Sequence, residues 1–181
     1  MKISCAEIEK HDHACSLFNT NDEFIGYAVS MVRRSLNSHE QCLVLTDEIP
    51  ADDIKRYLSL LDLSPEALLD SGQLVFGQFG QFYLDGGTFH RRDMVHNVEK
   101  AARAALKLGF SGLRGIGELG QSLKHVDFTD FLNYEMEVQG LFFQYPISAL
   151  CAYRRSALDE DQVEKLLNIH PFHLVRSLAL F

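Results

Sequence analysis

A chain of 181 residues, of which 46% are hydrophobic, is long enough to bury a sizeable core and needs no more than one domain. Its formal net charge of -8 argues against direct binding to nucleic acid or to an anionic membrane. Its four cysteines form no closely spaced pair, and neither a secretory signal nor a membrane-spanning run is visible, so we expect reduced thiols in a cytoplasmic protein.

The first half of the chain alternates strand patterns with helix patterns. After a lead-in over residues 1–10, the apolar run 14–18 predicts a buried strand, and the polar turn behind it opens a helix over 22–36 with Asp22 as N-cap. The unbroken apolar run 41–46 is typical of a parallel strand covered on both faces. Two helices, over 51–61 and from Ser64 to Gly72, and a third strand over 73–76 follow.

The second half continues the alternation. Residues 77–89 are rich in glycine and aromatic side chains, which predicts a loop or hairpin over one end of the sheet with its turn at 85–87. The chain continues with a helix over 91–108, a short fourth strand over 112–116 and a corner at 117–120. It ends with a helix over 127–139, apolar runs around Pro146 that include a central strand, a helix over 159–169 and a last strand over 170–175. This order implies a three-layer α/β fold with a mostly parallel central sheet and helices on both faces.

Two histidines and a cysteine give the first strand a chemical face. Because side chains alternate along a strand, His11, His13 and Cys15 project to one side if the extended conformation reaches back that far. Three interpretations stay open: a core cysteine beside a histidine bonded to a backbone carbonyl, a ligand pocket with His13 as its polar group and Cys15 as its wall, or a zinc-type site completed by His11. The corner over residues 18–24 has neither glycine nor lysine and carries two acidic residues, which argues against a phosphate loop and nucleotide hydrolysis.

A second set of candidates lies around the fourth strand. Arg114 is costly to bury unpaired, so we expect an ion pair with Glu118 or with Glu135 on the next helix. Such a pair could tie strand to helix, recognise a polar end of a ligand, or supply catalytic carboxylates. The aromatic loop 76–89 predicts a lid over an apolar cavity, a covered sheet edge or a dimer surface. The remaining histidines, His170 among them, are interpreted as surface or locally hydrogen-bonded groups.

The order and spacing of several segments resemble the MEDS domain, the sensory domain of methanogen and methylotroph regulators that include the dichloromethane repressor family. These segments are HDHACSLF, QCLVLTDE, SGQLVF, GLRGIGE, FLNYE, LCAYRR and the closing HP, and they cover nearly the whole chain from about residue 11. The resemblance implies a RecA-like or circadian-clock-ATPase-like core that has lost its phosphate loop and senses small organic molecules, proposed to be hydrocarbon derivatives. The family's histidine-x-cysteine pattern falls on His13 and Cys15, and its aromatic position, often tyrosine, is Phe18 here.

We therefore expect one sensory domain over residues 1–181 that binds a small, largely apolar molecule in a crevice between the first and fourth strands and is not an enzyme. The expected ligand-binding residues are His13, Cys15, Phe18, Arg114, Glu118, Tyr134 and Glu135. No cofactor is expected, and no metal outside the alternative set of His11, His13 and Cys15. Family members are often attached to helix-turn-helix or kinase modules, and this chain shows none, so we expect output through a regulatory protein partner in trans or through a homodimer, in transcriptional or signal-transduction control. The alternatives are a non-enzymatic interaction module with a degenerate ATPase fold, and an enzyme that uses Glu118, Glu135 or Cys15.

Overall fold

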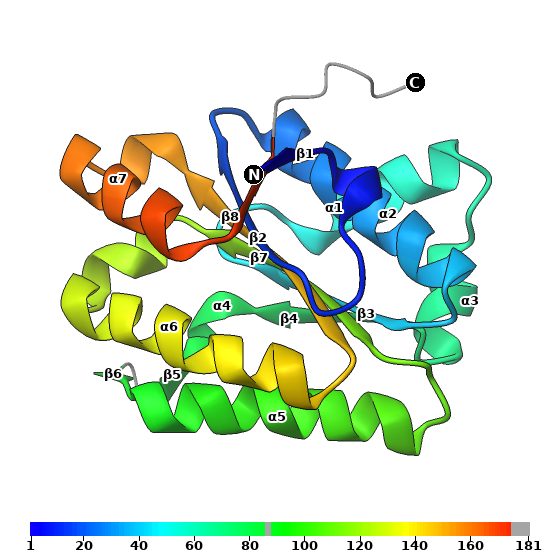
Figure 1. The fold of residues 1–181 in the computed structure, drawn as a ribbon. Helices are drawn as coiled ribbons and strands as arrows, with labels where there is room; N and C mark the ends of the chain where they lie inside the picture. The colour runs from blue at the N-terminus through cyan, green and yellow to red at the C-terminus, as the bar shows by residue number, and fades with distance from the viewer. Residues whose placement is uncertain (86–87, 175–181) are drawn as a thin grey trace.

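The computed structural model of the chain describes residues 1–85 and 88–174, and its centre is a seven-stranded sheet with helices on both faces (Figure 1). The strands lie in the order β1-β9-β2-β8-β7-β3-β4, and neighbouring strands pair in parallel. They are β1 (Lys2–Ile3), β2 (His13–Phe18), β3 (Gln41–Thr46), β4 (Leu74–Gln78), β7 (Leu113–Leu119), β8 (Ile147–Arg154) and β9 (Phe172–Leu174). The predicted three-layer α/β architecture is confirmed.

Each face of the sheet is covered by its own helices and has its own apolar core. One face packs against α1 (Asn21–Asn37), α2 (Ala51–Leu60) and α3 (Pro65–Asp70). The other packs against α4 (Phe79–Tyr83), α5 (Arg91–Lys107), α6 (Phe128–Gln144) and α7 (Glu160–Ile169). A small antiparallel hairpin, β5 (Leu84–Asp85) and β6 (Thr88–Phe89), lies beside α5 and α6, and 3-10 turns occupy Cys5–Glu7, Gln121–His125 and Arg155–Ala157.

Strand alternation assigns the side chains of β2 and β7 to these two faces. In β2, Cys15 joins the core beneath α5 to α7, whereas Ala14 and Phe18 join the core beneath α1 and α2. In β7, Leu113 belongs to the first of these cores and Ile116 to the second. Odd-numbered and even-numbered positions of these strands therefore have different surroundings, as a period of two requires.

Three sequence-based boundaries were wrong. Helix α1 begins one residue earlier because the Thr20 side chain accepts the Glu23 N–H and acts as N-cap in place of Asp22. Strand β7 continues to Leu119, so the predicted corner at 117–120 is mostly extended strand. Helix α6 continues to Gln144, because the break comes only where Pro146 disfavours helix.

The lead-in over residues 1–10 contributes strand β1 at the edge of the sheet, next to β9. The predicted aromatic loop contains α4 and the β5–β6 hairpin, and its turn residues 86–87 lie outside the described residues. Within residues 1–85 and 88–174, no helix combines the length and the apolar character that a bilayer crossing demands.

Candidate functional site

Four ionisable side chains from separate elements converge beneath α6 and α7. His13 begins β2, Cys151 lies in β8, Glu135 lies in α6, and His170 directly follows α7. The Nε2 atom of His13 lies 3.3 Å from both the Cys151 sulfur and the Glu135 Oε2, and the His170 Nε2 lies 3.6 Å from the same oxygen. His13, Glu135 and His170 are each at most 3% exposed. We call these four residues the His–Glu–Cys–His cluster.

A second layer of hydrogen bonds orients the cluster from behind. The Nδ1 atoms of His13 and His170 face the Gln139 side-chain oxygen at 3.0 Å and the Leu166 carbonyl oxygen at 2.8 Å. Oxygens of this kind only accept, so both Nδ1 atoms donate and both Nε2 atoms face the cluster. The Tyr153 hydroxyl donates to Glu135 Oε1 at 2.9 Å, which leaves Oε2 as the inward oxygen.

The cluster controls the charges of its own members. Burial alone lowers the pKa of His13, but the Cys151 sulfur and the Glu135 carboxylate outweigh it and raise that pKa to about 9. Burial opposes ionisation of Cys151 and Glu135 too, yet the two imidazoles hold both pKa values below their usual range. His170 is likewise buried, and its contacts with Cys15, Cys151 and Glu135 raise its pKa well above the usual value. Each acidic group of the cluster therefore favours its negative form beside the imidazoles, and each imidazole favours its positive form beside the acidic groups.

A cavity of about 60 Å³ adjoins the cluster between the sheet and helices α5 and α6. His13 and Cys151 form its polar end, and the rest of its wall is largely apolar, with side chains such as Val98 and Val138. Gly115 and Gly117 of β7 lie in the wall, where a Cβ on Gly117 would meet no atom within 4 Å. The cavity exists in part because these two positions carry no side chain.

The cavity does not lie in the crevice predicted between the first and fourth strands. Those strands are β2 and β7, and β8 separates them in the sheet. The carboxyl end of β2, where the predicted corner lies, has a different hollow of about 350 Å³ lined by residues that include Cys15, Asn19 and Arg155.

The structure brings four of the seven predicted ligand-binding residues to one face of the sheet. His13 and Glu135 belong to the cluster, Cys15 contacts its His170, and Tyr134 lines the cavity. The other three, Phe18, Arg114 and Glu118, belong to the opposite face or to the carboxyl end of the strands.

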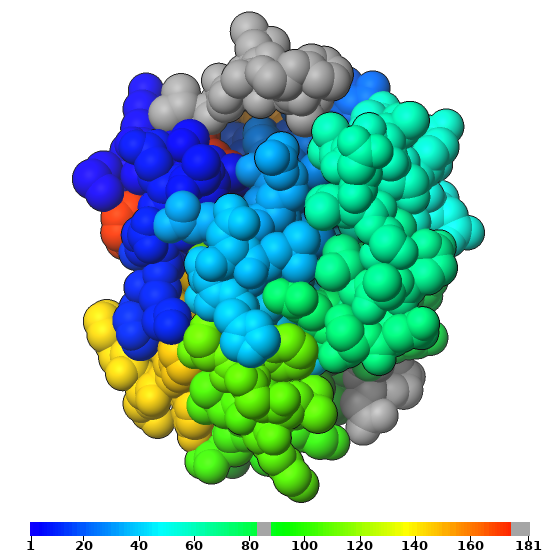
Figure 2. Space-filling view, turned by 90° about the vertical axis from the view of Figure 1, so that its right-hand side faces the viewer, coloured from blue at the N-terminus to red at the C-terminus, as the bar shows by residue number. Residues whose placement is uncertain are grey.

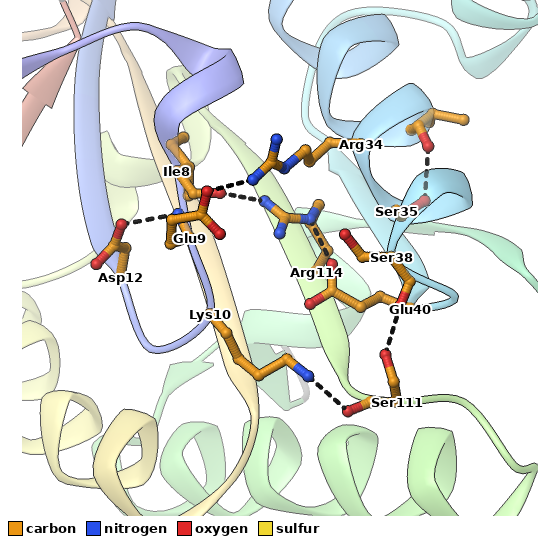
Figure 3. A network of polar contacts seen from close by, with 11 residues as sticks. Ile8, Glu9, Lys10, Asp12, Arg34, Ser35, Ser38, Glu40, Ser111 and Arg114 are labelled. Carbon is orange, nitrogen blue, oxygen red and sulfur yellow. Dashed lines mark hydrogen bonds and ion pairs between the residues drawn. The ribbon is translucent and has the colours of Figure 1, made fainter.

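The predicted ion pair of Arg114 with Glu118 or Glu135 is wrong. The Arg114 Nε donates to Glu40 at 2.7 Å, and its Nη1 donates to the Ile8 carbonyl at 3.0 Å (Figure 3). Glu135 lies across the sheet, and Glu118 follows Arg114 by four residues, about 13 Å along a strand. On this side of the molecule the N-terminal segment lies beside α1 (Figure 2), and an ion pair between Glu9 and Arg34 joins them.

Glu118 and Phe18 have structural surroundings at the carboxyl ends of the strands. The Glu118 Oε2 accepts the backbone N–H groups of residues 47, 48 and 49 at 2.8, 3.1 and 2.9 Å. Its Oε1 pairs with Arg154 at 3.1 Å, and the same guanidinium lies 4.7 Å above the Phe18 ring. Glu118 therefore holds the turn after β3.

His11 stays outside the cluster, because it lies before β2 with φ +77° and its Nδ1 contacts the Phe142 carbonyl. The extended conformation does not reach back that far, so the predicted shared face is limited to His13 and Cys15. Around His13 the structure groups Glu135, Cys151 and His170 in place of the alternative metal set of His11, His13 and Cys15.

Sequence reasoning missed Cys151, Tyr153, Gln139 and His170. Cys151 and Tyr153 alternate along β8, and this spacing could have placed them on one face once β8 was recognised as central. Local sequence held no comparable signal for His170. Its interpretation as a surface or locally bonded group was wrong in part, because it is 3% exposed and faces the cluster.

Comparison with known proteins agrees with the fold. No curated protein matches the sequence. Among solved structures, the flagellar accessory protein FlaH from Methanocaldococcus jannaschii is similar with a TM-score of 0.63 at 11% identity, over 92% of this chain and 71% of that chain. This likeness shows the fold alone, which is RecA-like. The family model described as the MEthanogen/methylotroph, DcmR Sensory domain matches residues 12–171, so the chain belongs to the MEDS family of sensory domains, as the resemblance predicted.

Proposed function

We propose that this sensory domain binds a small, largely apolar organic molecule in the cavity between the sheet and helices α5 and α6, and that it does so without transforming the molecule chemically. The observation that carries the proposal is the cavity of about 60 Å³, with an apolar wall and one polar end at His13 and Cys151. A single water needs only about 10–15 Å³ on a comparable measure, so the space suits a few non-hydrogen atoms. Apolar walls with few polar groups are typical of small-molecule sites.

Two alternatives receive less support. The cavity beside His13 favours a ligand-binding domain over a pure protein-interaction module, because an interaction module needs no internal cavity. Both oxygens of Glu118 are engaged in holding the turn after β3, so this carboxylate is poorly placed for catalysis.

Output would begin at Phe82 of α4, which contributes to the cavity wall and belongs to the predicted aromatic loop. Its backbone carbonyl accepts a hydrogen bond from Asn97 of α5 at 3.1 Å. If α4 has two arrangements and the ligand contacts Phe82 more closely in one of them, ligand binding raises the population of that arrangement. We propose that a protein partner in trans, or a second copy of the chain, reads that shift.

The test is thermal unfolding with a panel of short alcohols, thioethers and halogenated hydrocarbons. A compound that binds, present at a free concentration of about 100 times its Kd, should raise the free energy of unfolding by about 2.7 kcal/mol. Gly117→Leu, which fills the cavity, and His13→Ala, which removes part of its polar end, should abolish the response, whereas Gly140→Ala on the exposed side of α6 should retain it. Absence of stabilisation by every class of compound, or an undiminished response in Gly117→Leu, would count against the proposal.

A further inference from the structure

We propose that His13, Glu135, Cys151 and His170 form a four-coordinate site for one zinc-class divalent metal ion, bound through His13 Nε2, Glu135 Oε2, Cys151 Sγ and His170 Nε2. The inference goes beyond the proposed function and does not depend on it. Nothing in it requires an organic molecule in the cavity.

The spacing of the four atoms suits a tetrahedral ion. Zinc–nitrogen and zinc–oxygen bonds of about 2.0–2.2 Å and zinc–sulfur bonds of about 2.3 Å place tetrahedral ligand atoms roughly 3.3–3.8 Å apart. The His13 Nε2 lies 3.3 Å from Cys151 Sγ and 3.3 Å from Glu135 Oε2. The remaining contacts of Glu135 Oε2 are 3.6 Å to His170 Nε2 and 3.8 Å to Cys151 Sγ, and all four atoms lie within 4.8 Å of one another.

One atom of the cluster has no hydrogen-bond partner. The His170 Nε2 is buried and has no hydrogen bond, since its contact with Glu135 Oε2 is 3.6 Å long, and the ring is fixed because its Nδ1 donates to the Leu166 carbonyl at 2.8 Å. A buried polar atom of this kind costs stability unless something satisfies it. Once this nitrogen releases its proton, its lone pair faces the other three ligand atoms, and a metal ion is a partner of the right type.

The atoms behind the cluster match the outer layer of a metal site. Metal-binding histidines usually donate their second N–H to a carbonyl, an amide oxygen or a carboxylate, which fixes the tautomer. The Gln139 oxygen does this for His13, and the Leu166 carbonyl does it for His170. The Tyr153 hydroxyl holds the outer oxygen of Glu135 in the same way.

Charge and ligand type select the ion. A thiolate and a carboxylate carry two negative charges, and one divalent cation with two neutral imidazoles balances them in a buried place. Binding releases to solvent any proton on the Cys151 sulfur and the Nε2 protons of the two imidazoles, whose Nδ1 protons stay, and it requires no change in oxidation state. Two nitrogens, one sulfur and one oxygen favour zinc or cobalt(II) over calcium and magnesium, which prefer oxygen ligands. The cavity, which shares His13 and Cys151, places a hollow beside the ion.

The experiment titrates chelator-treated protein with zinc and then with cobalt(II). One equivalent should bind, and cobalt should give the visible absorption of a tetrahedral site together with a thiolate-to-cobalt charge-transfer band. Cys151→Ser should remove that band and weaken zinc at least 10-fold, and His170→Gln should weaken zinc by a similar factor. Cys5→Ser and His173→Asn, outside the cluster, should bind as the unchanged protein does.

Titration of the unchanged protein keeps the test independent of whether a variant folds. Binding of well under one equivalent, an octahedral cobalt spectrum, or a thiolate band that persists in Cys151→Ser would overturn the proposal. Repetition of the organic panel on metal-free and metal-loaded protein separates the two proposals, because either response can fail while the other remains.

Discussion

The two faces of the sheet each bury a cluster of charges, and the clusters differ in how completely their atoms are satisfied. Under α1, Arg114 and Glu40 are each 1% exposed and form an ion pair at 2.7 Å, and Arg114 also donates a hydrogen bond to the Ile8 carbonyl. Under α6 and α7, the His–Glu–Cys–His cluster leaves the His170 Nε2 without a hydrogen bond and adjoins a cavity. The first arrangement is closed and structural, and the second has room for a further group.

The cysteines show the same difference. Burial raises the pKa of Cys5 and of Cys42 to about 12, so both stay thiols at neutral pH. Burial also opposes ionisation of Cys151, but His13 and His170 lower its pKa. Chemistry suited to a ligand or a metal is therefore concentrated on one face, while the other face holds the fold together.

Breaking the buried ion pair of Arg114 and Glu40 should have the largest effect on stability. Arg114→Met leaves the Glu40 carboxylate buried without its partner, which should lower the free energy of unfolding by about 3–5 kcal/mol in urea denaturation. The double variant Arg114→Met, Glu40→Leu should recover much of that loss, because no charge stays buried. A loss below about 1 kcal/mol in the single variant would mean that the pair does not act as a closed structural unit.

Removing one supporting hydrogen bond of the His–Glu–Cys–His cluster should have an intermediate effect on stability. Tyr153→Phe deletes the buried hydroxyl that donates to Glu135, and a bond to a charged acceptor contributes about 1.5–3 kcal/mol. Tyr57→Phe is the matched control, because its hydroxyl reaches Asp22 at 3.2 Å near the surface and should contribute under about 1 kcal/mol. Equal losses in the two variants would show that Glu135 does not depend on Tyr153.

The smallest effect is expected where the cavity wall lacks a side chain. Gly117→Ala adds a methyl group into open space, and the lower entropy of the unfolded chain should raise stability by about 0.4–1 kcal/mol in thermal unfolding. Gly112→Ala is the contrasting variant, because its Cβ would lie 2.3 Å from the Pro146 carbonyl oxygen and should destabilise the protein. Strong destabilisation by Gly117→Ala would mean that the hollow beside β7 does not accept a side chain.

Local patterns in the sequence were enough for the layers and the family. The unbroken run 41–46, the helical spacing after residue 21 and the alternation of strands with helices predicted the parallel sheet covered on both faces. The shared face of His13 and Cys15 also followed from the period of a strand.

What the sequence by itself determined is therefore which segments form strands and helices, and which side chains of one strand share a face. Only the tertiary structure decided which charges meet, since His13 is 126 residues from Gln139 and 138 from Cys151. Periodicity describes neighbours along one element and carries no information on which strand lies beside it or which helix lies above. The pairing of β2 with β8, and the packing of α6 and α7 over them, assembled the cluster from residues that no local pattern connects.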